Sequence, residues 1–355
     1  MGGVSPQEAE RSPDPSQRPV PRVPLPMAAG SRPRVPDRRP TVIPGRGPIG
    51  DGRPMWQQLM PQGVERRPPW LTVRMPVGPT YEQLQRTMRS GRLNTVCEEA
   101  HCPNLGECWS YGTATFMILG DTCTRACAFC AVRSGRPEGL DREEPARVAT
   151  AARAMALRHV VVTSVDRDDL PDGGAGIFAE TIRRLHEAVP GCAVEVLTPD
   201  FQGAEASVAT VMAAGPEIFN HNIETVPRLF PRVRPKSGYR RSLAVLRTAK
   251  RLRPASRSKS GLMVGLGESA DEVRAVLRDL RAHDVELVTI GQYLRPSLKH
   301  IACDRFWHPE EFAELAAYGR ALGFAHIEAG PLVRSSYHAH AQAEAAAPAS
   351  ALAAG

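Results

Sequence analysis

The segment that decides the fold is Phe116-Met-Ile-Leu-Gly-Asp-Thr-Cys-Thr-Arg-Ala-Cys-Ala-Phe-Cys130, an apolar run followed by three cysteines. The apolar run predicts a strand that ends at Gly120, so the cysteines fall on the loop after it. Cys123, Cys127 and Cys130 have the spacing C-x3-C-x2-C, which can hold three corners of a cubane iron–sulfur cluster. The fourth iron then has no protein ligand, and an open coordination position is typical of metal sites that do chemistry.

Two other interpretations of this spacing predict different structures. Cysteines at i, i+4 and i+7 lie on one face of a helix, where free cysteine packs as a small hydrophobe. Thr122, Thr124 and Arg125 interrupt such a face, and Gly120-Asp121 ends the apolar run before it. A zinc site usually brings paired C-x2-C units or histidines at set distances, and no such second pair stands here. The spacing therefore favours a cluster over both alternatives.

A second cysteine triplet precedes the first. Cys97, Cys102 and Cys108 have the spacing C-x4-C-x5-C, so six of the eight cysteines lie between residues 97 and 130. Disulfides would explain such density in a small secreted domain, but this chain has no apolar signal segment and is too large to need them. The second triplet therefore predicts a separate three-thiolate site. Cys192 and Cys303 are unclustered and are predicted to be structural. His101 is a candidate ligand, although an isolated histidine is more often a surface or packing residue.

Further short sequence motifs accompany the two cysteine triplets. They are Gly112-Thr-Ala-Thr-Phe-Met-Ile-Leu-Gly120, Thr163-Ser-Val-Asp-Arg-Asp-Asp-Leu170, Phe219-Asn-His-Asn-Ile-Glu224, Lys259-Ser-Gly-Leu-Met-Val-Gly-Leu-Gly-Glu268, Gly291-Gln-Tyr-Leu-Arg-Pro296 and Arg334-Ser-Ser-Tyr-His338. With both triplets in this order, residues 67 to 340 resemble the lipoyl synthases, a family of radical S-adenosylmethionine (SAM) enzymes. Biotin synthase, another sulfur-inserting radical SAM enzyme, shares the C-x3-C-x2-C motif but lacks the N-terminal triplet joined to a C-terminal Arg-Ser-Ser-Tyr.

The resemblance implies the chemistry of the C-x3-C-x2-C motif. Cys123, Cys127 and Cys130 would hold a 4Fe–4S cluster whose open iron is chelated by SAM. One electron from the cluster would cleave SAM to methionine and a 5′-deoxyadenosyl radical. That radical removes hydrogen from an unactivated methylene, which no ordinary acid, base or nucleophile of a side chain can do.

The second triplet has a different role in this resemblance. Cys97, Cys102 and Cys108, with Ser336 as the fourth ligand, would hold an auxiliary 4Fe–4S cluster that donates sulfur and is consumed. Two cycles would place sulfur at C6 and C8 of an octanoyl chain amide-linked to a carrier lysine. The implied partners are octanoylated lipoyl-carrier domains (2-oxoacid dehydrogenase E2 subunits and glycine cleavage H protein), a one-electron reductant and iron–sulfur assembly proteins. Neither nucleic acid nor membrane is an expected partner, and the expected location is the cytoplasm.

The sequence predicts four regions. Residues 1–66 are rich in Pro, Arg and Gly without apolar periodicity, so we expect a disordered tail, or a start codon assigned too early with Met27, Met55 or Met60 as the true start. Residues 67–112 form an extension that carries the auxiliary cysteines, residues 113–330 the catalytic domain, and residues 331–355 a C-terminal segment that frays from about Ala341. Residues 1–70 carry eleven Arg and six acidic residues, so +5 of the formal +7 lies there. Scattered Arg residues with intervening acids argue against a nucleic-acid arm or a transit peptide.

Strand and helix patterns alternate through the catalytic domain. The expected strands are Ala114–Leu119, His159–Thr163, Ala193–Leu197, Glu217–Asn222, Ser260–Val264, Glu286–Ile290 and Ala325–Glu328. The expected helices are Pro145–Leu157, Gly176–Ala188, Ala206–Ala213, Arg241–Arg253, Ser269–Ala282, which begins with the capping pattern Ser-x-x-Glu, and Pro309–Leu322. Six or seven βα units predict an α/β fold, a partial (βα)6-type parallel barrel. An iron–sulfur electron carrier, the alternative function, would leave most of this scaffold unexplained.

Active sites of such folds lie at the carboxyl ends of the strands. Short polar segments follow several strands there, although their residue types are also those that turns and helix caps require. Gly265-Leu-Gly267 alone is too weak a pattern to indicate a nucleotide site. Asn222 and Glu224 are the predicted polar contacts to SAM. Phe129, between two cluster cysteines, is the predicted apolar contact to the cluster or adenine.

Deleting residues 2 to about 60 should change folding and turnover little, because their composition provides no core. Arg66-Arg67-Pro-Pro-Trp70 should be kept, since the resemblance begins there and Trp70 is expected to pack on the domain. Thermal unfolding and iron content of the truncated and full-length proteins test this expectation. A large loss of either on truncation would contradict it.

Overall fold

The computed structural model describes residues 67–71, 86–89, 91–95, 104, 108, 113–337, 339 and 342. Its main feature is a curved sheet of eight strands in the order β1-β2-β5-β6-β7-β8-β9-β10. The bounds are β1 Asn94–Thr95, β2 Thr113–Ile118, β5 His159–Ser164, β6 Ala193–Leu197, β7 Ile218–Asn220, β8 Arg257–Val264, β9 Leu287–Gln292 and β10 His326–Gly330. β1 is antiparallel to β2, whereas every other neighbouring pair is parallel.

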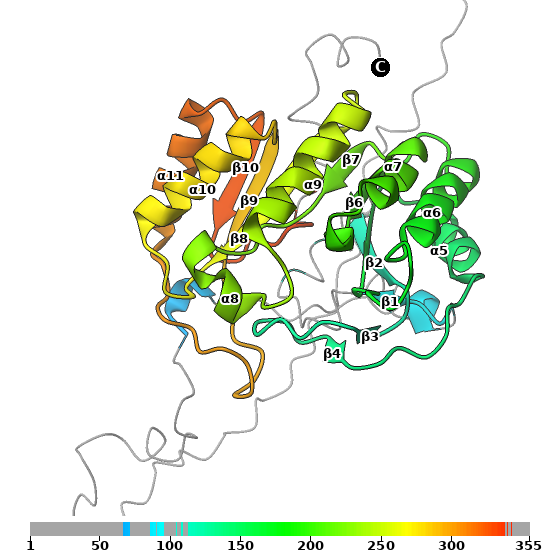
Figure 1. Ribbon diagram of the computed structural model, residues 1–355, viewed down its shortest axis with the longest axis horizontal. Coiled ribbons are helices and arrows are strands. Elements are labelled where there is room, and N and C mark those ends of the chain that lie inside the picture. Colours follow the sequence, from blue (N-terminus) through cyan, green and yellow to red (C-terminus); the bar gives the residue numbers. More distant parts are fainter. Residues whose placement is uncertain are drawn as a thin grey trace, which may run out of the picture. The chain divides into compact units, whose positions relative to one another are not determined.

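Helices connect the parallel strands and cover the outer face of the sheet (Figure 1). The six long ones are α5 Glu144–Ala154, α6 Ala175–Ala188, α7 Glu205–Ala213, α9 Tyr239–Leu252, α10 Ala270–Ala282 and α11 Pro309–Ala321. Each stands between two strands that are neighbours in the sheet, which gives six consecutive βα units. Within the part of the chain that the structure describes, β1 and β10 remain at opposite edges, so the predicted partial barrel of the (βα)6 type is confirmed.

All seven predicted strands and all six predicted helices are present, with ends that differ by a few residues. Every residue of the interior strand β9 is buried, and parallel strands that are buried on both faces have apolar, β-branched sequences. At the start of α10 the predicted capping pattern is a complete capping box. Ser269 Oγ accepts from the Glu272 N–H at 3.2 Å, and the Glu272 carboxylate accepts from the Ser269 N–H at 2.9 Å.

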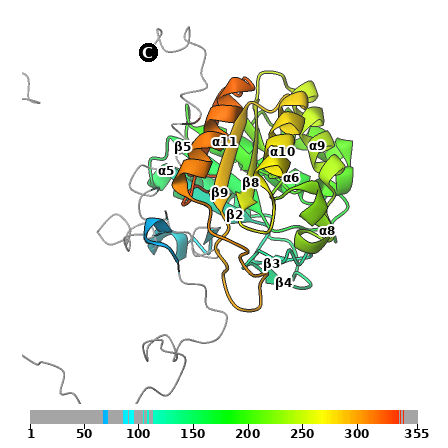
Figure 2. The ribbon, with the colours of Figure 1, turned by 90° about the vertical axis from the view of Figure 1, so that its left-hand side faces the viewer.

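Short elements that the sequence did not indicate surround the strand ends. α8 Phe230–Val233 precedes α9, and a two-strand parallel pair, β3 Thr122–Cys123 and β4 Arg133–Ser134, brackets the cysteine loop. Figure 2 shows β3, β4 and α8 below the long helices. Trp70 packs edge-to-face against His308 with ring centroids 4.9 Å apart, which confirms that this residue contacts the domain. The predicted tail, residues 1–66, lies outside the described residues.

A buried ion pair lies on the inner face of the sheet. Lys259 Nζ on β8 lies 2.9 Å from Glu195 Oε1 on β6, and neither side chain is exposed. Asn220 Nδ2 also donates to this carboxylate at 3.1 Å, and His159 Nε2 lies 3.4 Å from its other oxygen. Burial alone would raise the pKa of Glu195, but Lys259 and His159 outweigh it and lower the pKa to about 2. The carboxylate therefore stays ionised at neutral and mildly acidic pH.

Changing Lys259 to Met should destabilise the protein by about 3–5 kcal/mol, because the change leaves a buried carboxylate without its cation. Urea unfolding of wild type and variant under anaerobic conditions measures the difference. Because the folded-state pKa of Glu195 is depressed, the pair's contribution is present above its ordinary pKa of 4.5 and is lost as pH falls toward 2. The difference between the two proteins should therefore shrink as pH falls below 4.5.

An exposed ion pair provides the matched control. Arg251 and Glu205 join α9 to α7 with side chains that are 57% and 61% exposed. Arg251→Met should change stability little, since such pairs are solvated in both the folded and unfolded states. Equal stability of Lys259→Met and wild type would show that the buried pair does not hold the strands together.

Candidate active site

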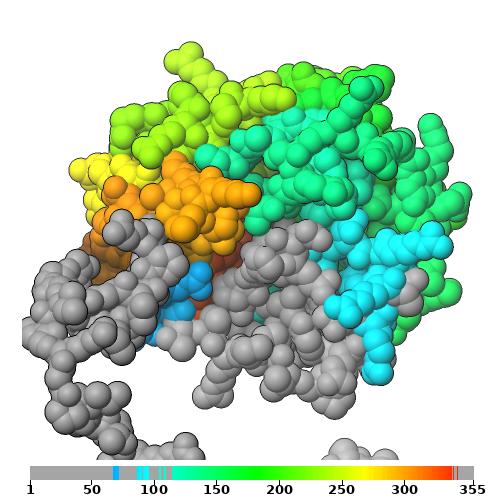
Figure 3. Space-filling model, turned by 90° about the horizontal axis from the view of Figure 1, so that it is seen from below, coloured from blue at the N-terminus to red at the C-terminus, as the bar shows by residue number. Residues whose placement is uncertain are grey.

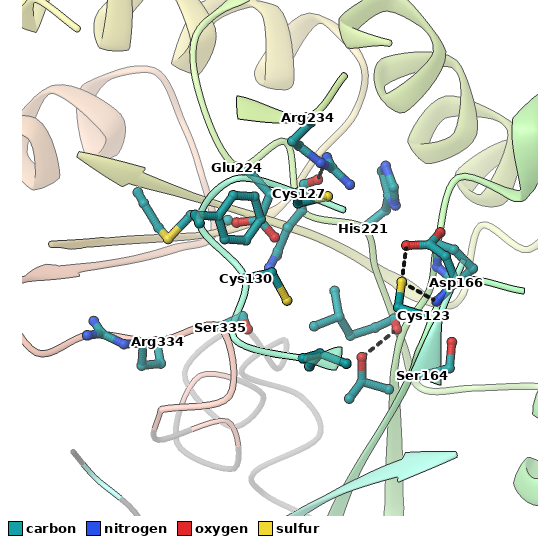
Figure 4. A pocket seen from close by; sticks show the side chains of 18 of the residues that line it. Cys123, Cys127, Cys130, Ser164, Asp166, His221, Glu224, Arg234, Arg334 and Ser335 are labelled. Atoms are coloured by element: carbon teal, nitrogen blue, oxygen red, sulfur yellow. Dashed lines mark hydrogen bonds between the residues drawn. The ribbon is translucent and has the colours of Figure 1, made fainter. Parts of the chain in front are cut away.

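One cavity of about 310 Å³ lies at the carboxyl ends of the strands. Cys123, Cys127 and Cys130 all line it, so the structure brings the predicted triplet to one site (Figure 4). The remaining walls come from the ends of β5, β6 and β7, from the inner face of β8 and β9, and from the chain after β10. Asn222, Glu224 and Phe129 line the cavity as well, so all three residues predicted to contact SAM or the cluster face the same space.

The cysteines lie on a loop and not on a helix. β2 ends at Ile118, and Cys123 belongs to the two-residue strand β3. Cys130 lies in a turn, where its N–H donates to the Cys127 carbonyl at 3.1 Å. This arrangement excludes the helix-face interpretation. Among the residues that the structure describes, no three His, Cys, Asp or Glu side chains converge on a point that could hold a single metal ion. The three cysteines line one cavity, as the ligands of a single cluster must.

The loop is held by segments that are distant in sequence. The Ala128 N–H donates to the Val233 carbonyl at 3.0 Å, and the Ala128 carbonyl accepts from the Ile301 N–H at 2.9 Å. His300 Nε2 lies 3.0 Å from the Cys130 carbonyl oxygen. Figure 3 shows the loop between β9 and α11, in orange, beside the teal cysteine segment. The position of the cysteines is therefore set by tertiary contacts on both sides of the loop.

Burial makes these cysteines weak acids before a cluster binds. It raises the pKa of Cys127 to about 11 and the pKa of Cys130 to about 12, and it also raises the pKa of Cys123. The thiols therefore carry their protons at neutral pH. Because iron is bound by thiolates, cluster binding must release these protons.

Polar atoms without partners face the cavity. Ser164 Oγ, Thr198 Oγ1 and Asn222 Oδ1 are buried, line the cavity and have no hydrogen-bond partner among the described residues. Such atoms are rare in folded proteins, since each one left unpaired costs free energy. A Cβ at Gly261 would lie 2.8 Å from Asn222 Oδ1, so only glycine leaves this atom its place. The cavity thus fits a polar ligand such as SAM beside three thiolates.

Glu224 occupies a strained backbone position. Its φ is 67°, in the left-handed region that residues with a side chain rarely adopt. β8 fixes this conformation, because the Glu224 N–H donates to the Gly261 carbonyl and the Met263 N–H donates to the Glu224 carbonyl, both at 2.9 Å. Burial raises the pKa of Glu224, while Arg234 and Asn222 act in the opposite direction. Strain of this kind is typical of functional sites.

Two cavity residues had no role assigned from the sequence. Arg234 is buried, and its Nη1 donates to the Asn222 carbonyl at 2.9 Å, so it positions the predicted SAM contact. His221 is held between the Thr198 carbonyl at 2.8 Å and Ser242 Oγ at 2.9 Å. Burial and the nearby Arg234 lower the pKa of His221 to about 4, so its ring is neutral at physiological pH. Arg234 lies in none of the quoted motifs. His221 lies in Phe219–Glu224, but nothing local distinguishes it there as a cavity residue.

Two structural interpretations are confirmed. Glu268 accepts from the Leu266 N–H at 2.9 Å and also from the Gly265 N–H, so this glycine-containing stretch is a self-contained turn outside the cavity. Cys192 and Cys303 are buried in the two hydrophobic clusters between sheet and helices.

The predicted auxiliary site is described only in part. Cys97, Cys102 and His101 lie outside the described residues, whereas Cys108 is buried. Asn104 Nδ2, between the last two cysteines of the triplet in sequence, donates to the Leu332 carbonyl at 2.6 Å. Leu332 is four residues before Ser336, which lies half-buried in a turn, and the neighbouring Ser335 lines the cavity. The second triplet's segment therefore contacts the segment that carries Ser336.

Sequence comparison agrees with the fold and the cavity. The model of the Radical SAM superfamily matches residues 117–280, and the model of the N-terminal domain of lipoyl synthase matches residues 57–102. A (βα)6 sheet with three cysteines and a polar cavity at its carboxyl end thus defines a radical SAM enzyme, whose cofactors are SAM and a 4Fe–4S cluster.

Curated relatives give the family. Lipoyl synthase of Rubrobacter xylanophilus is 58% identical over 84% of this chain and 93% of its own length. The enzymes of Oceanobacillus iheyensis and Thermus thermophilus are each 55% identical, over 78% and 79% of this chain and 88% of their own lengths. The chain belongs to the lipoyl synthase family and acts in lipoate biosynthesis. None of its described helices is long and apolar enough to cross a membrane.

Proposed function

We propose that this enzyme inserts two sulfur atoms, at C6 and C8, into an octanoyl chain that is amide-linked to a lysine of a carrier protein. The observation that carries the proposal is the cavity itself. Three cysteines line it, and so do three buried side-chain oxygens that have no partner among the described residues. When bound there, the 4Fe–4S cluster supplies the electron that cleaves SAM and so the radical that removes hydrogen from a methylene.

The residues around the cavity have separable roles. Cys123, Cys127 and Cys130 hold three irons and leave one position open. Asn222 and Glu224 bind the polar groups of SAM, with Arg234 holding the Asn222 backbone. Phe129 packs against the hydrophobic core formed by residues of β8 to β10. Its ring gives the cavity an apolar wall on the side of the cysteines. The chain's own contribution is therefore binding, orientation and exclusion of water.

The sulfur source is proposed to be an auxiliary 4Fe–4S cluster on Cys97, Cys102 and Cys108, with Ser336 as the fourth ligand. The support is the contact between the triplet's segment and Leu332, together with the location of Val333 to Ser335 in the cavity wall. A cluster at this place would lie where the methylene radical is formed.

The proposed partners follow from this reaction. Octanoylated E2 subunits of 2-oxoacid dehydrogenases and glycine cleavage H protein would present the chain, a one-electron reductant would supply electrons, and iron–sulfur assembly proteins would rebuild the auxiliary cluster.

Anaerobic incubation of reconstituted enzyme with SAM, reductant and an octanoylated lipoyl domain tests the proposal. Mass analysis should show a domain that has gained two sulfur atoms, with methionine and 5′-deoxyadenosine released. An iron–sulfur electron carrier would release neither product, and release without sulfur gain would overturn the sulfur-insertion step alone.

A further inference from the structure

Arg125 lies between two cluster cysteines in sequence, yet its side chain is only 2% exposed. Its neighbours Thr124 and Ala126 are not buried, so Arg125 is the buried side chain of the stretch between Cys123 and Cys127. All three guanidinium nitrogens are used. Nε and Nη2 bond the two oxygens of Asp168 at 2.8 and 2.7 Å, Nη2 also bonds Asp200 at 2.7 Å, and Nη1 donates to Ser237 Oγ at 3.2 Å.

The partners of Arg125 come from three separate connections. Asp168 follows β5, Asp200 follows β6 and begins the 3-10 turn Phe201–Gly203, and Ser237 follows α8. Only a planar fork with several donors can bond all three at once, because a lysine ammonium is a compact charge on a flexible stem. The guanidinium thus fastens the cysteine loop to the carboxyl ends of two neighbouring strands.

Backbone N–H groups on both sides of this junction bond the sulfur of Cys123. Cys123 Sγ accepts from the Asp166 N–H at 3.3 Å and from the Arg125 N–H at 3.4 Å, and Figure 4 marks the bond from Asp166. Thr124 adds a second tie, since its N–H and its hydroxyl both donate to the Asp166 carbonyl, at 3.0 and 2.9 Å. The Arg125 side chain and these bonds therefore hold Cys123 against the residues that follow β5.

The chain segments that Arg125 bonds, at the ends of β5 and β6, also carry two of the cavity oxygens that have no hydrogen-bond partner within the described part of the chain. Ser164 is the last residue of β5, four residues before Asp168, and Thr198 follows β6, two residues before Asp200. Both oxygens face the cavity without a partner. A single side chain consequently connects the cysteine wall of the cavity with the wall that these two polar atoms form.

We infer that Arg125 is a positioning residue, which sets the orientation of the cluster on Cys123 relative to the ends of β5 and β6, against which the rest of SAM lies. This inference rests on the proposed assignment of Cys123, Cys127 and Cys130 to the SAM cluster. The guanidinium of Arg125 is bonded to Asp168 and Asp200, so the residue acts through Cys123 and through these two carboxylates. Loss of stability alone would not identify positioning, because breaking one partner of any buried ion pair destabilises the fold.

Two variants and one control test the inference in reconstituted enzyme. Arg125→Lys keeps the positive charge but removes the planar guanidinium and its several donors. Asp168→Asn keeps the side-chain size but removes the negative charge of one carboxylate. Glu286→Gln is the control: Glu286 pairs with Lys250 at 2.8 Å and Arg257 at 2.6 Å near the amino end of β9, and its exposure, 18%, resembles the 24% of Asp168. All three changes weaken partly buried ion pairs, but only the first two act on the cysteine loop.

Three measurements separate positioning from stability. Backbone amides of residues 124–131 should exchange with deuterium about tenfold faster in both loop variants than in wild type. The EPR spectrum of the reduced cluster should respond to SAM differently from wild type. Sulfur inserted per 5′-deoxyadenosine released should fall about tenfold, because a misplaced radical is quenched before it reaches the substrate. Glu286→Gln should match wild type in all three.

The outcomes are distinct. Loop variants that lose only thermal stability, with exchange, EPR response and sulfur yield like the control, would overturn the inference and make Arg125 a structural residue. Should Arg125→Lys fail to fold, Asp168→Asn alone decides, because its side chain is partly solvated. A wild-type cluster that never responds to SAM would overturn the cluster assignment and this inference with it.

Discussion

Changing Cys123, Cys127 and Cys130 together to alanine should abolish SAM cleavage and remove about half of the iron from the reconstituted enzyme. The reason is that each triplet holds its own cluster, so the protein keeps the auxiliary cluster and loses the one that binds SAM. Iron and sulfide analysis with Mössbauer spectroscopy measures the clusters, and 5′-deoxyadenosine release measures the chemistry. Loss of activity should be complete, because the auxiliary cluster, with Ser336 as its fourth ligand, has no open iron at which SAM can bind.

The control for this variant replaces cysteines outside the cavity. Cys192 and Cys303 are buried in the hydrophobic clusters between sheet and helices. Changing both to alanine should lower stability through lost packing while leaving both clusters and SAM cleavage in place. If the triple variant lost all of its iron, or if zinc were the metal found in wild type, the assignment of two clusters would be wrong.

Changing Ser336 to Cys should keep the auxiliary cluster and slow or stop sulfur insertion, while SAM cleavage survives at least in part. A serine oxygen is a harder ligand than thiolate and suits iron–sulfur sites less well, so an iron held by Ser336 leaves readily once sulfur is attacked. A thiolate there would bind that iron more firmly. Ser336→Ala should instead impair the auxiliary cluster and leave the SAM cluster intact, which Mössbauer spectroscopy can separate.

The neighbouring serine distinguishes a ligand from a turn residue. Ser335 lies one position away and lines the cavity, so Ser335→Ala perturbs the same turn. It should keep the iron of the auxiliary cluster, whereas Ser336→Ala should not. Normal lipoyl formation by Ser336→Cys and Ser336→Ala would return Ser336 to an ordinary role as a polar residue in a turn.

The order of strands and helices could be predicted because each one has its own local pattern. β5, with the sequence His-Val-Val-Val-Thr-Ser, is an example: continuous burial in a parallel sheet requires such a run. The start of β8 could not be predicted in the same way. Its first residues, Arg257 to Lys259, are polar, and they can lie in a central strand because Lys259 pairs with Glu195, 64 residues earlier. A local window contains no sign of that partner.

The same distinction applies to the cavity. Spacing indicated the three cysteines, and the polar words after the strands indicated Asn222 and Glu224, all of which line the cavity. Arg125 and Arg234 were missed because an arginine in a loop is usually solvated, and only contacts with distant segments identify these two as buried. Ser336 remains a prediction that rests on family resemblance.

The bonds that hold the cysteine loop also determine when it can take shape during synthesis. Cys130 leaves the ribosome 170 residues before His300, whose ring nitrogen bonds the Cys130 carbonyl oxygen. Val233 and Ile301, which bond Ala128 on either side, are also translated long after the cysteines. Domains tend to fold from the N-terminus as they emerge from the ribosome. Here the cysteine loop cannot make all of its contacts until the segment around residue 300 has been translated. Delivery of iron and sulfide to Cys123, Cys127 and Cys130 is therefore expected to follow release of the chain, and a nascent chain stalled before residue 300 should carry these cysteines as free thiols open to alkylation.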